Sequence, residues 1–281
     1  TLDTCQVDSH PEFYALSYVW GSDAKTQKIV CNGKELGVTE SVHAALASLR
    51  GTLTLRLEET GTPIWIDAIC INQDDNDERS RQVARMDWIY REAKCVIVWL
   101  GKGDAQTDFA MSNMEHLATI LSNIEAEQKL LAEELEPKWT TGFRRSPLCW
   151  HERLWTFQEA VLSRSLQFVC GDFMVNSEAF MTVVHGLAKY ELRWLFGNNP
   201  LHHGFAGFGA IIDAKQNAVG AAGLLTVTAE RQCKEPLDRI YGLLSSMPGE
   251  FRRKILVLYT RDINEVYVEM GKACLEEANS L

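Results

Sequence analysis

A glutamate and a tryptophan one helical turn apart are the side chains best suited to catalysis in this sequence. His151, Trp155 and Glu159 recur at intervals of four residues, so they share one face of the helix that we expect over Trp150–Ser163. An indole ring supplies a stacking surface and excludes water, and a carboxylate beside it can stabilise a developing cation. The alternative interpretation is an exposed glutamate on the solvated side of a helix.

A second carboxylate, Asp67, lies within the otherwise apolar run Ile64–Ile71, which predicts a central strand buried on both faces. A carboxylate in such a place costs several kcal/mol unless it is paired or hydrogen-bonded. The helix expected over Glu78–Ala93 offers four candidate partners: Arg79, Arg81, Arg85 and Arg91. Asp67 therefore predicts either a buried salt bridge or loop anchor, or a direct contact with a ligand.

The first expected strand, Phe13–Trp20, ends in polar and aromatic residues, which are Ser17, Tyr18, Trp20 and the adjoining Gly21. Open α/β sheets bind ligands at the carboxyl ends of their strands, and Asn72 follows the run Ile64–Ile71 in an equivalent position. We therefore expect one cleft to collect five of the candidates: Ser17, Trp20, Asp67, Asn72 and Glu159. The alternative is a strand end that only contributes a core tryptophan.

The elements that carry these residues predict an α/β fold with a mostly parallel sheet. The strand Ile64–Ile71, the helix Glu78–Ala93 and the strand Cys95–Leu100 form a strand–helix–strand unit, which implies parallel pairing. We expect residues 1–172 to form the α/β core. Residues 173–281, whose pattern is mostly helical, are expected to form a C-terminal lobe packed on that core.

Local signals predict three further elements. The dipeptide Asn32-Gly33 favours a hairpin over Lys28–Leu36, because a type I′ turn needs two residues with positive φ. Thr39 can cap a helix that reaches Leu49 and ends at Gly51. A short strand is expected over Leu166–Cys170.

Charge and composition exclude several classes of function. The net charge of −10 and the pI of about 5.3 disfavour nucleic acid as a partner. No apolar run approaches the roughly 20 residues of a membrane helix, and the first residues do not form a signal peptide. The eight cysteines include no Cys-x-x-Cys pair, so we expect free thiols in a reducing, cytoplasmic compartment and no metal site.

Other nucleotide-binding and hydrolase motifs are weak or absent. Gly101–Asp104 has two glycines after a strand, but Gln106 stands where a dinucleotide-binding fingerprint needs glycine. The sequence has no P-loop and no Gly-x-Ser-x-Gly motif. Cys70 and His151 could form a catalytic dyad of a thiol hydrolase. The apolar run around Cys70 instead favours an unreactive, packed thiol. The helical segment Asp104–Glu136 is open to three interpretations: packing on the sheet, a lid, or partner binding.

Taken together, several of these blocks resemble the fungal heterokaryon-incompatibility (HET) domain. The matching core blocks are Ala15–Gly21, Trp65–Gln73, Glu78-Arg79, Gln82-Val83, Met86, Ile89-Tyr90, Ala93, Val96–Gly101 and Arg153–Glu159. Later blocks resemble the segment that follows the core in such proteins, and these are Pro236–Leu244, Tyr259 and Glu265–Tyr267. The resemblance therefore extends over nearly the whole chain.

The resemblance implies a fold and an activity. HET domains are thought to be distant relatives of TIR domains, which implies a TIR-like or flavodoxin-like sheet flanked by helices. Enzymatic TIR domains carry a Trp-x-x-x-Glu motif whose glutamate serves NAD⁺ cleavage, and this role falls on Glu159, with Trp155 as its tryptophan. The resemblance thus implies an NAD⁺ glycohydrolase with NAD⁺ as substrate and no tightly bound cofactor.

In cellular terms, the resemblance implies a cytoplasmic effector of fungal non-self recognition and programmed cell death. The cofactor-binding set expected for NAD⁺ or a related nucleotide is Ser17, Tyr18, Trp20, Gly21, Asp67, Asn72 and Trp155. The resemblance also implies that the chain forms homo-oligomers on activation and acts with an upstream sensor domain or protein. Nucleic acid and membranes are not expected partners. Two alternatives remain open: a non-enzymatic module that signals by self-association, and a nucleotide sensor without turnover.

Overall fold

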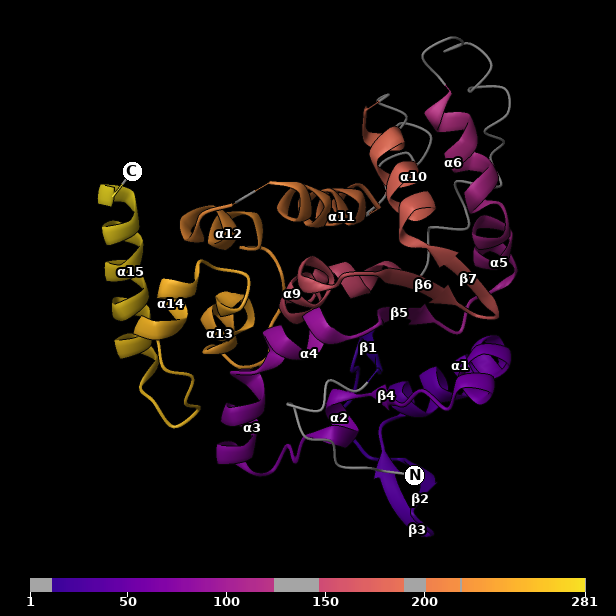
Figure 1. The fold of residues 1–281 in the computed structure, drawn as a ribbon, viewed down its shortest axis with the longest axis horizontal. Coiled ribbons are helices and arrows are strands. Elements are labelled where there is room, and N and C mark those ends of the chain that lie inside the picture. The colour runs from indigo at the N-terminus through magenta and orange to yellow at the C-terminus, as the bar shows by residue number, and fades with distance from the viewer. Residues whose placement is uncertain (1–11, 124–146, 190–200, 218, 281) are drawn as a thin grey trace.

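The computed structural model describes residues 12–123, 147–189, 201–217 and 219–280. Its main sheet has the order β4-β1-β5-β6-β7 (Figure 1). The strands are β1 (Tyr14–Tyr18), β4 (Ile64–Trp65), β5 (Cys95–Gly101), β6 (Leu166–Cys170) and β7 (Phe173–Asn176). Pairing is parallel from β4 through β6 and antiparallel only between β6 and β7. The expected α/β class with a mostly parallel sheet is confirmed.

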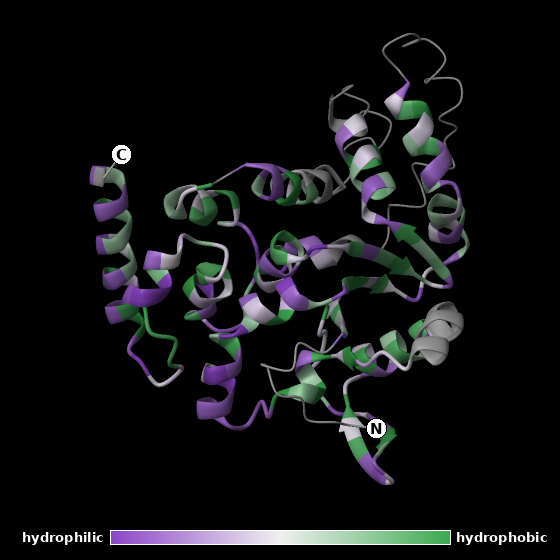
Figure 2. Cartoon of the chain, viewed as in Figure 1, coloured by the Kyte–Doolittle hydropathy of each residue, from purple (hydrophilic) through white to green (hydrophobic). Residues whose placement is uncertain are grey.

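Alternating side chains on the central strand separate two hydrophobic layers. Val96 and Val98 of β5 belong to the larger cluster, while Ile97 and Trp99 point to the opposite face and join the smaller one. Residues 95–100 of β5 are all buried, as expected for a parallel strand covered on both faces. The strands of the sheet are accordingly among the most apolar parts of the chain (Figure 2).

Helix α1 (Glu40–Thr60) and the hairpin of β2 (Gln27–Cys31) with β3 (Lys34–Val38) lie on one side of the sheet (Figure 1). The hairpin was predicted correctly, since Asn32 and Gly33 at its turn have φ of 51° and 75°. Thr39 also caps α1 as expected, because its hydroxyl accepts the Val42 amide at 3.3 Å. The helix does not end at Gly51, however, and continues to Thr60.

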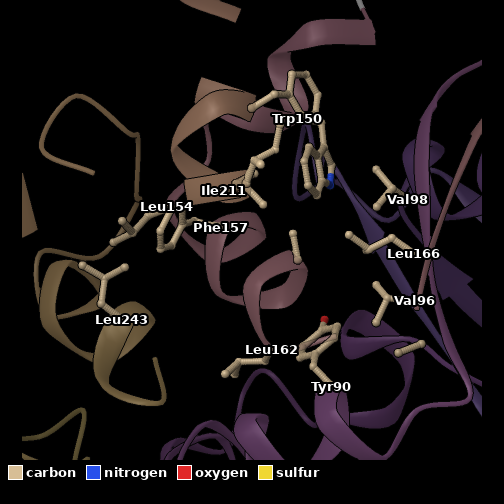
Figure 3. Packing of buried hydrophobic residues seen from close by; sticks show 14 of the residues in the cluster. Tyr90, Val96, Val98, Trp150, Leu154, Phe157, Leu162, Leu166, Ile211 and Leu243 are labelled. Atoms are coloured by element: carbon tan, nitrogen blue, oxygen red, sulfur yellow. The ribbon is translucent and has the colours of Figure 1, made fainter. Parts of the chain in front are cut away.

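Helix α9 (Leu154–Leu162) is enclosed by the larger hydrophobic cluster on the other side of the sheet (Figure 3). Most of its residues are buried, including Phe157 and the polar Gln158, so it is a central helix rather than a surface one. Its remaining neighbours are the helices α4 (Met86–Glu92), α11 (Leu201–Gln216) and α13 (Asp238–Leu244). A glutamate on this helix is therefore removed from bulk solvent.

The strand expected over Ile64–Ile71 is much shorter than predicted. β4 is an edge strand of two residues, and the chain then turns into the short helix α2 (Asp67–Cys70). Asp67 accepts the backbone amide of Ala68 at 2.7 Å, which favours a helical turn over continued sheet pairing. Asp67 is thus the first residue of a helix at the carboxyl end of β4, and its prediction as a strand residue was wrong.

Two other expected helices are interrupted. The segment Glu78–Ala93 forms α3 (Asn76–Val83) and α4, which are separated at Arg85. Asp75 starts α3 by accepting the amides of Asp77 and Glu78. The segment Trp150–Ser163 forms a 3₁₀ turn over Pro147–Glu152 followed by α9. This break removes His151 from the helix of Trp155 and Glu159, so the expected three-residue face was wrong.

The segment Asp104–Glu136 is helical as far as it is described, with α5 (Ala105–Ser112) and α6 (Met114–Ser122). The buried side chains of α6 pack against α10 (Ser177–Lys189), which supports the interpretation as packing on the core. Residues 124–136 lie outside the described part of the chain.

The C-terminal region is helical, as expected, apart from β7. It contains α10, α11, α12 (Ala221–Val227), α13, α14 (Gly249–Lys254) and α15 (Ile263–Ser280). β7 lies just beyond the expected boundary at residue 172 and pairs with β6. The division into two domains stays a prediction. No helix in the described part of the chain is both long and apolar enough to cross a membrane.

The expected free thiols agree with the described cysteines. Cys95 and Cys170 are buried, while partial exposure is found for Cys31, Cys70, Cys233 and Cys274, and all of these are unpaired. Burial raises the pKa of the Cys70 thiol, which disfavours the reactive thiolate.

Candidate functional site

A cleft of about 650 Å³ opens at the carboxyl ends of β1 and β4. The loop after β1, the helices α2, α3, α9 and α13, and Tyr259 all contribute residues to its lining. Its volume is in the range of small-molecule sites, and its position is the one that open parallel sheets use for ligands. The expected candidates that line it are Trp20, Gly21, Asp67, Trp155 and Glu159.

A relay of two hydrogen bonds, from Trp150 to Ser17 and from Ser17 to Glu159, fixes the Glu159 carboxylate from the protein interior. Trp150, which is completely buried, donates its indole N–H to Ser17 Oγ at 2.8 Å. The Ser17 hydroxyl in turn donates to Glu159 Oε2. Because Ser17 is itself buried, it orients the carboxylate from the protein side, while Glu159 faces the cleft with only 5% of its surface exposed.

Burial, and after it the nearby charge of Asp67, raise the pKa of Glu159 to about 7. The hydrogen bond from Ser17 and the positive charge of Arg153 act in the opposite direction without cancelling these effects. A carboxyl group that changes charge near neutral pH in a cleft is a common mark of a functional site.

Asp67 forms the neighbouring anchor point of the cleft. The Trp20 indole N–H donates to its Oδ2 at 2.7 Å, and the Ala68 amide donates to Oδ1. An indole N–H and a backbone amide, rather than an arginine, therefore satisfy this carboxylate. Although Asp67 as a residue is partly exposed, burial around its carboxyl group raises its pKa, against the effect of the Trp20 bond and of Arg153.

Arg153 contributes charge rather than an ion pair to this end of the cleft. Its Nη1 donates to the carbonyl oxygen of Tyr18 at 2.9 Å, and its guanidinium carbon lies 5.8 Å from the Trp20 ring centroid. The arginines of the 78–93 segment, from which a partner for Asp67 was expected, do not pair with it. The fixed position of Arg153 moderates the repulsion between Asp67 and Glu159.

Two tyrosines, Tyr18 and Tyr90, lie near the carboxylates of Asp67 and Glu159. Tyr18 and Tyr90 are almost fully buried, and their hydroxyls find no partner of good hydrogen-bond geometry in the described part of the chain. The pKa of each phenol is raised by burial and then by the nearby charge of Asp67 for Tyr18 and of Glu159 for Tyr90. Both therefore remain protonated and stand near the carboxylates as neutral donors.

A second polar cluster, whose assembly was not predicted from the sequence, also lines the cleft. Asp238 Oδ2 accepts the Trp155 indole N–H at 3.0 Å, and its Oδ1 accepts the Tyr259 hydroxyl at 2.6 Å. The Arg79 guanidinium lies 3.6 Å from the Tyr259 ring centroid. An aspartate between the apolar residues Leu237 and Ile240 was an available signal, but the partners come from distant parts of the chain.

The structure thus collects most, but not all, of the predicted residues. Ser17 and Tyr18 lie directly behind the cleft wall rather than on it. Asn72 is exposed and absent from the cleft, because its side chain accepts the Asp74 amide within the loop. Its predicted place in the site was wrong, and the cleft is instead lined by Gln73. Buried His151 also lies outside the cleft, next to Phe208.

Gly21 is the residue at which the chain turns into the cleft wall, with φ of 69°. A Cβ at this position would lie 2.9 Å from Ser41 Oγ. We expect Gly21→Ala to lower the free energy of unfolding by about 1–2 kcal/mol, the cost of a left-handed conformation for a residue with a side chain. Chemical denaturation measures the loss. Gly271→Ala in α15, where a Cβ has open space, is the control and should be neutral or stabilising.

The fold and the cleft define an α/β domain with a carboxylate-lined cleft at the carboxyl edge of a mostly parallel sheet. Residues 13–159 match the family model described as "Heterokaryon incompatibility protein (HET)". This match covers just over half of the chain, and the chain belongs to the HET family.

A curated relative supports this assignment. "Heterokaryon incompatibility protein 6, OR allele" of Neurospora crassa is 33% identical over 211 residues, which cover 62% of this chain and 31% of the relative. The alignment thus spans only about a third of the length of that relative. No solved structure matches the chain significantly, so the likeness to TIR domains stays a prediction.

Proposed function

We propose that this chain is an effector domain of fungal non-self recognition that cleaves NAD⁺ at the nicotinamide–ribose bond. The observation that carries the proposal is the Glu159 carboxylate, which is buried at the cleft and fixed by Ser17. The role in non-self recognition is taken from the family and from the name of the Neurospora relative.

The proposed chemistry needs one ionised carboxylate. Nicotinamide carries a positive charge in NAD⁺ and leaves as a neutral molecule, so it needs little assistance from an acid. Positive charge then develops on the ribose, where the Glu159 carboxylate stabilises it. Water adds to the anomeric carbon and releases a proton, which gives ADP-ribose and free nicotinamide. Asp67 adds negative charge beside the same centre, and Trp20 and Trp155 offer rings for stacking.

Incubation of the purified chain with NAD⁺, with detection of nicotinamide and ADP-ribose, tests the proposal. Release of both products, dependent on Glu159, is the expected result. NAD⁺ binding without products would favour a nucleotide sensor. Neither binding nor turnover, together with self-association of the chain, would favour a scaffold that signals by assembly.

The pH dependence of cleavage tests the role of the carboxylate. Because the ionised form of Glu159 is the active one and its pKa is about 7, kcat/KM should rise as the pH increases through that region and level off above it. Initial rates between pH 5 and pH 9 measure the profile. Asp67 shares the titration, so the apparent value belongs to the pair. A rate that falls as the pH rises would instead identify Glu159 as a proton donor and contradict the proposed mechanism.

A further inference from the structure

The cleft contains few positive charges that are able to meet an anionic group. The cations that line it are Lys25, Arg79, Arg153 and Lys234. Lys234 pairs with Asp23, and Arg153 is bonded to the Tyr18 carbonyl. Lys25 is exposed on a flexible aliphatic stem, so its position is poorly defined. Arg79 differs from all three, because stacking on Tyr259 holds it in place while, in the described part of the chain, its guanidinium has no hydrogen-bond or ion-pair partner.

A series of contacts that begins at Trp155 of α9 fixes the position of Arg79. Trp155 donates to Asp238, Tyr259 donates to the same carboxylate, and the Tyr259 ring lies against the Arg79 guanidinium. The Tyr259 backbone amide also donates to Ser80 Oγ on α3, at 3.3 Å, which ties the ring to the helix of Arg79. The guanidinium is therefore presented to the cleft in a fixed orientation.

The hydrogen-bonding capacity of Arg79 is unused. Its buried Nε has no partner, and within the described part of the chain the guanidinium makes no hydrogen bond or ion pair. Asp238 is near enough for its charge to be felt, but both its oxygens are occupied by Trp155 and Tyr259. A planar guanidinium fixed by stacking, with free N–H groups at a cleft, suits the paired oxygens of a phosphate.

We infer that Arg79 anchors a phosphate group of the ligand, at a subsite formed with Tyr259, Asp238 and Trp155. The inference deepens the proposed function, on which it rests for the identity of the ligand: the diphosphate of NAD⁺ binds Arg79, and the ribose to be cleaved lies at Glu159. Trp155 and Glu159 are one helical turn apart on α9, so the anchor is connected to the reacting end of the cleft.

The test compares ligands with and without phosphate. NAD⁺ and ADP-ribose carry the diphosphate, whereas nicotinamide riboside has the reacting bond but no phosphate. In NMR titrations, Arg79→Gln should weaken NAD⁺ and ADP-ribose about 10- to 100-fold, the usual effect of losing a charge-assisted hydrogen bond. The affinity for nicotinamide riboside should be unchanged. Arg79→Lys, which keeps the charge without the planar fork, should lose less.

Arg81→Gln is the matched control, because Arg81 lies on the same helix but is exposed and outside the cleft. It should leave all three affinities unchanged. Unchanged NAD⁺ affinity in Arg79→Gln would overturn the inference, and so would an equal loss for nicotinamide riboside, which indicates a structural role. A wild type that binds ADP-ribose through Arg79 without cleaving NAD⁺ would refute the proposed activity but support the anchor. A wild type that binds neither NAD⁺ nor ADP-ribose would refute both.

Discussion

Replacing Glu159 with glutamine should lower the rate of NAD⁺ cleavage by at least about 100-fold, the typical cost of losing one preorganised electrostatic group. Glutamine keeps the shape of the side chain and can still accept the Ser17 hydroxyl, but it has no charge to stabilise the ribose cation. Nicotinamide release under saturating NAD⁺ measures the effect. Glu230→Gln, which makes the same change at an exposed glutamate, is the control and should retain full activity.

The same variant should gain stability at alkaline pH. The folded-state pKa of Glu159 is about 7, above its ordinary value of 4.5, so the folded protein binds the proton more tightly than the unfolded chain. Wild-type stability therefore falls as the pH rises from 4.5 to about 7, by roughly 3 kcal/mol at most. Glutamine does not titrate, so the Glu159→Gln variant does not lose this stability. The difference in urea midpoint between the variant and the wild type should therefore favour the variant more at pH 8 than at pH 5.

Loss of activity together with loss of folding would contradict this account. A variant that is inactive but at least as stable as the wild type at pH 8 assigns the defect to chemistry. If the variant retained wild-type cleavage, Glu159 would not be the stabilising carboxylate. Asp67, the other acidic group at that end of the cleft, would then be the next residue to replace.

Trp150→Ala should lower the free energy of unfolding by about 3–5 kcal/mol, the range for removing a large aromatic side chain from a core. Trp150 is completely buried in the larger hydrophobic cluster (Figure 3). It stacks on Phe208 with ring centroids 5.6 Å apart and meets the edge of Phe168. It also supplies the N–H that Ser17 accepts. Urea denaturation followed by far-UV circular dichroism measures the change in stability.

Two comparisons separate packing from hydrogen bonding. Trp150→Phe keeps a ring against Phe208 and removes the N–H, so most of the loss should be recovered. Trp88→Ala is the matched control. Trp88 also stacks on an aromatic ring, that of Phe13, but it is only partly buried. A loss from Trp150→Ala no larger than that from Trp88→Ala would show that Trp150 is not a centre of the core.

Local patterns along the chain were sufficient for much of the fold. Continuous apolar runs predicted β1, β5 and β6, and Asn32-Gly33 predicted the hairpin, because these signals act over a few neighbouring residues. The strand–helix–strand order predicted parallel pairing. Predictions were less accurate where a polar residue changes the local structure, as at Asp67, which starts a helix, and at Asn72, which closes its own loop.

The sequence predicted only part of the candidate site. Trp20, Asp67 and Glu159 were predicted to meet because strand ends of a parallel sheet share one edge, and they do line one cleft. The relay from Trp150 through Ser17 was not predicted, since it depends on side-chain orientation across the sheet.

Only the tertiary structure decided the second polar cluster of the cleft. Asp238 and Tyr259 are distant in sequence from Arg79 and Trp155, and no local pattern predicts that these four side chains contact one another. They meet because α13 packs against α9 and brings Asp238 to the Trp155 indole. Periodicity and turn signals specify elements one at a time, whereas this site depends on how buried faces of separate elements pack together.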